Sequence, residues 1–184
     1  MISAAVALTA VVAGLGLGRY LFGANATELT SVTSTVLLPP DVRIFPGNSP
    51  ARSGLLAVSR DGRQIAFTGQ TAKGSQIFVR AIGSQIARPV AGTEGGSFPA
   101  WSPDGKRLAF WQGRELKQVP SDGGAPQVIT PAIGQRSAAS WGPDDTLLFH
   151  VEYKQGLSRV SAAGGPASEV LPALGENISW FSPV

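Results

Sequence analysis

Apolar residues follow two different patterns along this chain. Residues 1 to 18, MISAAVALTAVVAGLGLG, carry no charge, and the apolar run continues past Arg19 to Phe22. From about residue 54 the apolar stretches are short and are separated by turns rich in Gly, Pro and Asp. Such stretches predict β-strands, and no segment past residue 26 shows sustained helical periodicity. We therefore expect one apolar helix followed by an all-β region.

The β region repeats one phrase three times. WSPDGKRLAF at residues 101–110 has a looser copy, VSRDGRQIAF, at 58–67 and another, WGPDDTLLFH, at 141–150. A short strand precedes each phrase, an apolar strand ends it, and two more strands follow. Four short strands per 40 residues are typical of a propeller blade, which buries its faces by stacking on neighbours. We predict an all-β partial β-propeller of about three four-stranded blades, at about 54–93, 94–133 and 134–173, with the start of a fourth at 174–184.

The phrase itself is interpreted as a strand reversal. Pro103 presets the first central turn position, Asp104 hydrogen-bonds the backbone that follows it, and Gly105 takes the positive-φ position. Leu108 and Phe110 alternate with a small residue, which predicts a half-buried strand.

Trp101 and Trp141 end the preceding strands at equivalent places. We expect these indole rings to pack between blades, because large aromatic side chains dominate such interfaces. A Trp that binds a ligand is the alternative.

The first 23 residues are predicted to form a single transmembrane helix that acts as a signal anchor. Ile2 to Phe22 is 21 residues, and about 20 are needed to span the hydrocarbon core. A signal peptide cleaved after the Ala24-Asn25-Ala26 triplet is the alternative, but no basic residue precedes the apolar run. A buried soluble helix is disfavoured because no polar face interrupts it. Residues 24–51 are expected to be a linker and an edge strand, since Pro39 and Pro40 cannot sit in a central ladder.

Composition removes several kinds of chemistry. There is no Cys, hence no disulfide and no thiolate site, and the single His150 is too little for a His-based metal site. The net charge is +3 without a dense Lys or Arg run, which argues against nucleic-acid binding. Asp144-Asp145 is interpreted as a turn cap rather than a cation site. We expect no catalytic, cofactor-binding or metal-binding residue, no cofactor, and no enzyme activity.

The phrase SPDGKRLAF resembles the strand-turn signature of the TolB-like, WD-repeat-like propeller family, over about residues 52 to 184. SRDGRQIAF lacks the Pro, and GPDDTLLFH lacks the final Gly. Residues 87–130 also resemble the propeller region that follows the membrane helix in some bacterial transmembrane serine/threonine kinases. The kinase motifs themselves are absent from this sequence. The resemblance implies a propeller on the extracytoplasmic (periplasmic) side of a membrane.

These observations predict a non-catalytic, membrane-anchored propeller that binds a protein partner or small ligand through its loops, as a sensor or scaffold. The alternative is the regulatory propeller of a kinase or a prolyl-oligopeptidase-type peptidase whose catalytic domain is missing. The sequence stops within the phrase ISWFSPV, so we expect a fragment of a larger protein. Several copies that complete a ring are the other reading. A three-blade array would self-associate through exposed blade edges.

Overall fold

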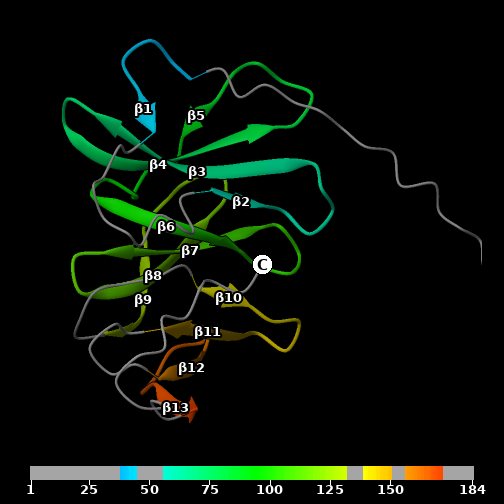
Figure 1. Ribbon diagram of the computed structural model, residues 1–184, viewed down its shortest axis with the longest axis vertical. Coiled ribbons are helices and arrows are strands. Elements are labelled where there is room, and N and C mark those ends of the chain that lie inside the picture. Colours follow the sequence, from blue (N-terminus) through cyan, green and yellow to red (C-terminus); the bar gives the residue numbers. More distant parts are fainter. Residues whose placement is uncertain (1–37, 45–55, 132–138, 151–155, 172–184) are drawn as a thin grey trace, which may run out of the picture. The chain divides into compact units, whose positions relative to one another are not determined.

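A computed structural model describes residues 38–44, 56–131, 139–150 and 156–171 (Figure 1). The chain divides into two compact units, Met1–Thr33 and Ser34–Val184, and all described residues belong to the second. The predicted membrane segment at 1–23 and the predicted start of a fourth blade at 174–184 lie outside the described residues. Within the described ranges, no helix is long and apolar enough to cross a membrane.

The described strands form three antiparallel sheets, each built from strands that follow one another in sequence (Figure 1). The first holds β1 (Arg43–Ile44), β2 (Leu56–Val58), β3 (Gln64–Thr71), β4 (Gly74–Ala81) and β5 (Arg88–Pro89). The second holds β6 (Gly96–Trp101), β7 (Arg107–Gln112), β8 (Glu115–Pro120) and β9 (Gln127–Pro131). The third holds β10 (Ser140–Trp141), β11 (Thr146–His150), β12 (Leu157–Ser161) and β13 (Ser168–Leu171). The predicted all-β class and the four-stranded antiparallel unit are confirmed.

The first sheet has five strands because β1 and β2 share one edge of β3. Leu56 and Val58 of β2 pair with Phe67 and Ile65, whereas Ile44 of β1 pairs further along, with Gly69. Paired residues lie on the same face of a sheet, and residues two apart along a strand share that face. Ile44, Leu56 and Val58 therefore form one row along the edge of a single face.

Neighbouring sheets pack face to face through two apolar cores. The core between the first and second sheets is formed by Ala66, Ile77, Val79 and Val90 with Trp101, Leu108, Phe110 and Val119. The core between the second and third sheets is formed by Ala100, Ala109, Trp111, Leu116 and Ile129 with Ala139, Leu147, Phe149, Val160 and Ala162. A third cluster lies on the other face of the first sheet and contains Val42, Ile65, Phe67, Phe78 and Ala87.

Strand β7 is buried on both faces, so the prediction of a half-buried strand is wrong. Leu108 and Phe110 point into the first core, and Ala109 and Trp111 point into the second. All four side chains have no exposed surface. The alternation was interpreted correctly, but a sheet in the middle of a stack has no face left for water.

The two predicted packing tryptophans lie between sheets. Trp101 is 7% exposed, belongs to the first core, and its Nε1 donates to the carbonyl oxygen of Ala57 in the first sheet at 3.1 Å. Trp141 is partly buried against the core between the second and third sheets. Both rings thus join consecutive sheets, as expected for blade contacts.

Candidate functional site

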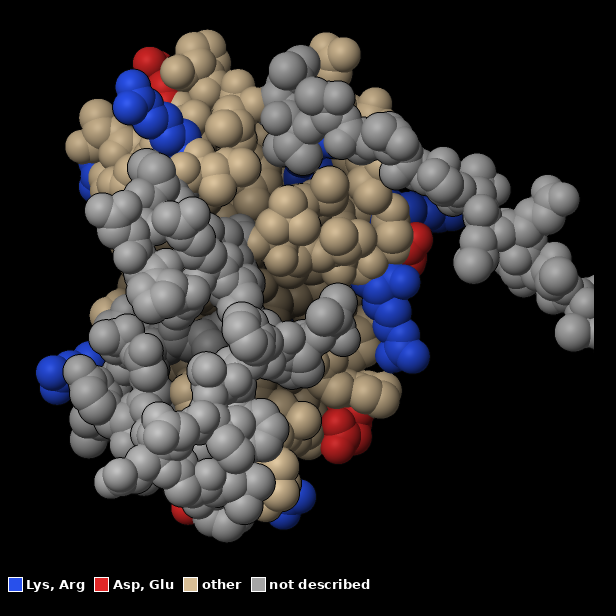
Figure 2. Space-filling model, viewed as in Figure 1, with Lys and Arg blue, Asp and Glu red and all other residues tan. Residues whose placement is uncertain are grey.

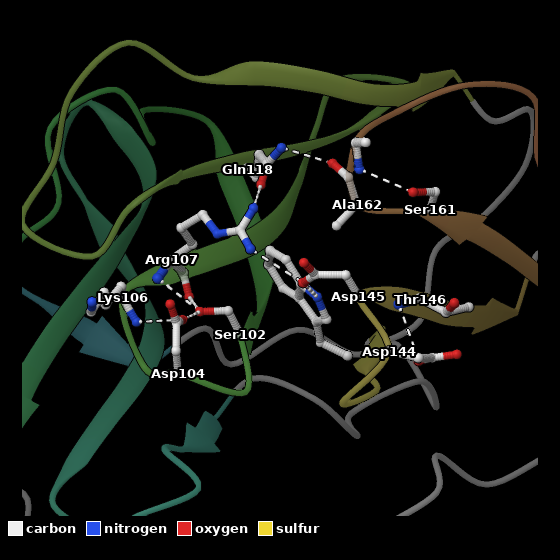
Figure 3. Close-up of polar contacts among 12 residues, drawn as sticks. Ser102, Asp104, Lys106, Arg107, Gln118, Asp144, Asp145, Thr146, Ser161 and Ala162 are labelled. Carbon is white, nitrogen blue, oxygen red and sulfur yellow. Dashed lines mark hydrogen bonds and ion pairs between the residues drawn. The ribbon is translucent and has the colours of Figure 1, made fainter.

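The turn between β6 and β7 is held by a closed set of hydrogen bonds. Ser102 Oγ donates to Asp104 Oδ1 at 2.6 Å, and the Lys106 N–H donates to the same oxygen at 3.1 Å (Figure 3). The Arg107 N–H donates back to Ser102 Oγ at 2.9 Å. Gly105 has φ 68°, a left-handed conformation that glycine adopts without a side-chain clash. The predicted roles of Asp104 and Gly105 are confirmed.

The turn between β2 and β3 repeats this arrangement without the proline. Ser59 Oγ donates to Asp61 Oδ1 at 2.6 Å. The Arg63 N–H donates to Asp61 Oδ1, and the Gln64 N–H donates to Ser59 Oγ. The sequence interpretation missed the serine, although its place two residues before the Asp is the visible signal. Serine and aspartate therefore define this turn more than proline does.

The third turn, between β10 and β11, is one residue shorter. Trp101 pairs with Leu108 across the second turn, whereas Trp141 pairs with Leu147 across the third. Gly142 replaces the serine, and Thr146 follows the turn where Arg107 does in the second sheet. The ungapped alignment of WGPDDTLLFH with WSPDGKRLAF is therefore wrong after the turn. From Thr146 onward, each residue of the third sheet corresponds to the residue one position later in the second phrase.

The third turn places Asp145 at a positive φ of 57°, where the other two turns have glycine. Asp is among the residues that tolerate this conformation, at some cost in strain. Asp144 does what Asp104 does, accepting the Thr146 N–H at 3.3 Å. The predicted turn-capping role is thus carried by the first of the two aspartates.

Hydrogen bonding lowers the pKa of each capping aspartate below the ordinary value. The Ser102 hydroxyl, then the Lys106 N–H, favour the ionised form and lower the pKa of Asp104. The Ser59 hydroxyl and the Arg63 N–H do the same for the pKa of Asp61, and Thr146 lowers the pKa of Asp144. A carboxylate held ionised in this way is suited to capping and poorly suited to act as a general acid.

These bonds predict an acid-dependent loss of stability. Because the folded-state pKa of Asp104 is depressed, its stabilising contribution is present above the unfolded-state pKa of about 3.8 and is lost as pH falls through the folded-state value. Asp104→Asn should lower the thermal midpoint at neutral pH, and the gap from the wild type should narrow as the pH falls below about 3.8. Ser102→Ala should lower it too, but part of that loss should persist at every pH, because Ser102 Oγ also bonds the Arg107 backbone. Melting curves across this range check it. A gap for Asp104→Asn that stays constant with pH would contradict the assignment.

A second polar group links the second and third sheets beside these turns (Figure 3). Arg107 Nη2 lies 3.2 Å from Asp145 Oδ1, which also accepts Trp141 Nε1 at 3.0 Å. The guanidinium carbon lies 4.9 Å from the centre of the Trp141 ring. Arg107 therefore makes an ion pair and a cation–π contact with the third sheet.

Gln118 completes this link from the adjacent strand β8. Its Oε1 accepts Arg107 Nη1 at 3.0 Å, and its Nε2 donates to the carbonyl oxygen of Ala162 at 2.8 Å. Gln118 is 9% exposed, so an unpaired amide oxygen there would be costly. We call Arg107, Gln118, Trp141 and Asp145 the inter-sheet clasp. Sequence reasoning missed it because its members lie up to 38 residues apart.

Replacing Arg107 should lower the free energy of unfolding by more than the loss of one exposed ion pair would. The Asp145 pair alone is worth at most about 1 kcal/mol. The cation–π contact and the orphaned Gln118 oxygen bring the expected loss for Arg107→Met to about 2 kcal/mol. Arg107→Lys should recover only part of it, because an ammonium lacks the planar fork. Urea unfolding curves measure both, and equal stability of the lysine and wild-type proteins would contradict the clasp.

The other residues singled out in the sequence do not gather into a site. His150 ends β11, opposite Leu157, and is half-buried. In the four described ranges, no three His, Asp or Glu side chains lie close enough together to hold a metal ion. What the described residues offer is a row of capped turns on one side of three stacked sheets (Figure 1).

Sequence comparison alone gives little. No protein-family profile matches the chain. An 80-residue segment is 39% identical to the chloroplastic betaine aldehyde dehydrogenase of Amaranthus hypochondriacus, which covers 43% of this chain and 16% of that protein. A match of this extent does not establish membership of that family.

Structural comparison identifies the class of fold. The chain is similar to the putative TolB from Agrobacterium tumefaciens, with TM-score 0.56, 20% identity, and coverage of 63% of this chain and 45% of that one. For TolB from Acinetobacter baumannii the TM-score is 0.53 and the identity 15%, with coverage of 65% of this chain and 32% of that one. For a chain of a nidogen/laminin complex the TM-score is 0.52 and the identity 11%, with coverage of 62% of this chain and 46% of that one.

Together with the four-stranded antiparallel sheets, these similarities show a β-propeller architecture. It is of the TolB-like kind that the Ser-Pro-Asp-Gly phrase predicted. The chain spans less than half the length of each of these structures. The comparisons do not show the resemblance to the kinase-linked region.

Proposed function

We propose that this chain is a non-catalytic propeller module that binds a protein partner or a small ligand through the turns of its blades. One observation carries the proposal. The aspartates of the three reversal turns cap their own turn or, as Asp145 does through Arg107, link neighbouring sheets. Turns that are held rigid by their own hydrogen bonds can present a fixed surface to a partner. In such folds, binding is usually carried by loops that a rigid scaffold positions.

Both ends of the sheets carry exposed cations. Arg60 and Lys106 are exposed at the reversal turns, and Lys73 and Arg114 are exposed at the opposite turns, after β3 and β7. In Figure 2, Lys and Arg alternate with Asp and Glu along the side where the reversal turns lie in Figure 1. A surface of alternating charge favours a partner with complementary charges, and we propose that the reversal-turn end is the binding end.

Site-specific photo-crosslinking tests this choice. A photoreactive amino acid would replace Lys106 or Arg60 at one end, and Lys73 or Arg114 at the other, in the full chain expressed in its own cells. We expect a discrete cross-linked product from the first pair only. Products from the opposite end alone would move the binding surface there, and products from neither end would contradict the proposal.

We also propose that residues 1–23 anchor the module as a single-pass membrane segment, with the propeller on the extracytoplasmic side. Support comes from the 21-residue, largely apolar stretch Ile2–Phe22, whose one charged residue, Arg19, lies near its end. Membranes washed with alkaline carbonate should retain the chain, and protease added outside intact cells should digest the propeller. Release by carbonate would contradict the anchor, and protection from protease would contradict the orientation.

A further inference from the structure

The chain contains three Asp-Gly dipeptides, at Asp61, Asp104 and Asp122, and all three lie in described turns. In such a dipeptide the glycine nitrogen can attack the aspartate side-chain carboxyl carbon, because glycine has no side chain to hinder the approach. In each turn the glycine has a positive φ, and its N–H donates to the carbonyl oxygen three residues earlier at 2.8–2.9 Å. The attacking nitrogen therefore has the same setting in all three turns.

The carboxyl groups that would be attacked are held differently, although all three are exposed. Asp61 and Asp104 each accept a serine hydroxyl and a backbone N–H on Oδ1 (Figure 3). These bonds, the hydroxyl first, lower the pKa of both residues and hold each carboxylate against its own turn. An ionised carboxylate is a poor electrophile, so capping protects it from attack. Within the described ranges, no hydrogen bond or ion pair holds the Asp122 carboxylate.

The third dipeptide lies in the connection between β8 and β9, residues 121–126, which packs on the first sheet. Arg88 Nη2 donates to the Ser121 carbonyl oxygen at 3.1 Å. The Gly124 N–H donates to the Ala91 carbonyl oxygen at 3.2 Å. The backbone on both sides of this Asp-Gly bond is therefore fixed to the preceding sheet.

We propose that Asp122 is the residue at which this chain forms isoaspartate, and that the change opens the contact between the first and second sheets. The Gly123 nitrogen bonds to Asp122 Cγ, and its proton leaves with the carboxyl hydroxyl as water, which gives a succinimide ring. Water then adds back to the ring. Cleavage between the ring nitrogen and the former main-chain carbonyl carbon gives isoaspartate, and cleavage between the nitrogen and Cγ restores aspartate.

Isoaspartate has the composition of aspartate, but its backbone is one methylene longer and its free carboxylate is the former main-chain carbonyl group. The connection has little room for this change, because a Cβ on Gly123 would lie 3.0 Å from the Ala91 nitrogen. The added length displaces Gly124 and breaks its hydrogen bond to Ala91. The first and second sheets then lose a contact that the unmodified chain makes.

The third sheet shows that this turn does not need the aspartate. Ala163 stands at the position of Asp122 and is likewise followed by two glycines at positive φ. The second of these, Gly165, donates its N–H to the Ile129 carbonyl oxygen of the preceding sheet at 3.1 Å. The same turn and the same kind of contact thus form with alanine. Asp122→Ala should therefore fold as the wild type does, and it cannot form the ring.

Ageing the purified full chain at neutral pH in heavy-oxygen water tests the proposal. Each ring opening adds one heavy oxygen, which peptide mapping by mass spectrometry locates, and a methyltransferase specific for isoaspartate measures the product. We expect several-fold more isoaspartate at Asp122 than at Asp61 or Asp104, and similar amounts at the three sites in urea, where the caps are absent. Equal amounts in the folded chain, or the same preference for Asp122 in urea, would overturn the proposal.

Two variants test the protection by capping and the opening of the contact. Ser102→Ala removes the hydroxyl that caps Asp104, so isoaspartate should rise several-fold at Asp104 in a chain that circular dichroism shows to be folded. No rise would overturn the protective role of the cap. The isoaspartate-containing wild type, separated by chromatography, should melt several degrees below the fresh protein, whereas aged Asp122→Ala should keep its midpoint. An isoaspartate form that melts like the fresh protein would overturn the opening of the contact.

Discussion

Replacing Trp111 with alanine should lower the free energy of unfolding by about 3–5 kcal/mol, the cost of truncating a fully buried large aromatic side chain. Trp111 has no exposed surface, lies in the core between the second and third sheets, and meets Phe149 edge to face at 5.5 Å. Because this ring fills the space between two sheets, the sheets cannot close the cavity without shifting against each other.

Urea unfolding with fluorescence and circular dichroism measures this loss. For a chain of this size the thermal midpoint should fall by roughly 6–20 °C. Val128→Ala is the control, since Val128 is 49% exposed, and it should change stability by less than about 0.5 kcal/mol. If Trp111→Ala cost no more than this control, the second and third sheets would not pack as described.

Gly92→Ala should destabilise the chain by about 2–5 kcal/mol, although it adds only a methyl group. Gly92 has φ +85°, and a Cβ there would overlap the backbone carbonyl oxygen of Gly124 in the β8–β9 connection. Left-handed strain contributes about 1–2 kcal/mol, and overpacking against backbone contributes about 1–3 kcal/mol more. The Gly124 N–H also donates to the Ala91 carbonyl oxygen at 3.2 Å, so the overlap pushes apart a bond between the first two sheets.

Gly95→Ala separates the two contributions. Gly95 has φ +76°, but a Cβ there meets nothing within 4 Å. This variant should lose about 1–2 kcal/mol from strain alone. Thermal and urea unfolding of the two variants give the difference. Equal losses would show that the close approach of Gly92 and Gly124 does not hold in solution.

The fold was predictable because its signals are local and repeated. Asp104 and Gly105 lie within one turn, and the Pro-Asp-Gly spacing encodes that turn without reference to the rest of the chain. The four consecutive strands of each unit followed from the spacing of turns and apolar stretches, whereas β1 joins the first sheet as a fifth strand.

Contacts between units were predictable only in kind. The position of Trp101 between sheets was expected. The shorter third turn was not expected, because the sequences of the second and third turns align over ten residues without a gap, whereas the structure places one residue fewer in the third turn. The clasp was missed because the sequence shows Arg107 beside Lys106 as an ordinary exposed pair. Its partners Trp141 and Asp145 come from another sheet, and only the stacking of sheets brings them together.

Because β7 is buried on both faces, its two faces become covered at different times during synthesis. Leu108 and Phe110 can pack as soon as the first sheet exists, because their partners precede them in the sequence. Ala109 and Trp111 must wait for Phe149 and Val160, which the ribosome adds about 40 residues later at about 5–20 residues per second. For those seconds the newly made second sheet exposes an unpaired apolar face, and we expect chaperones to contact the nascent chain there.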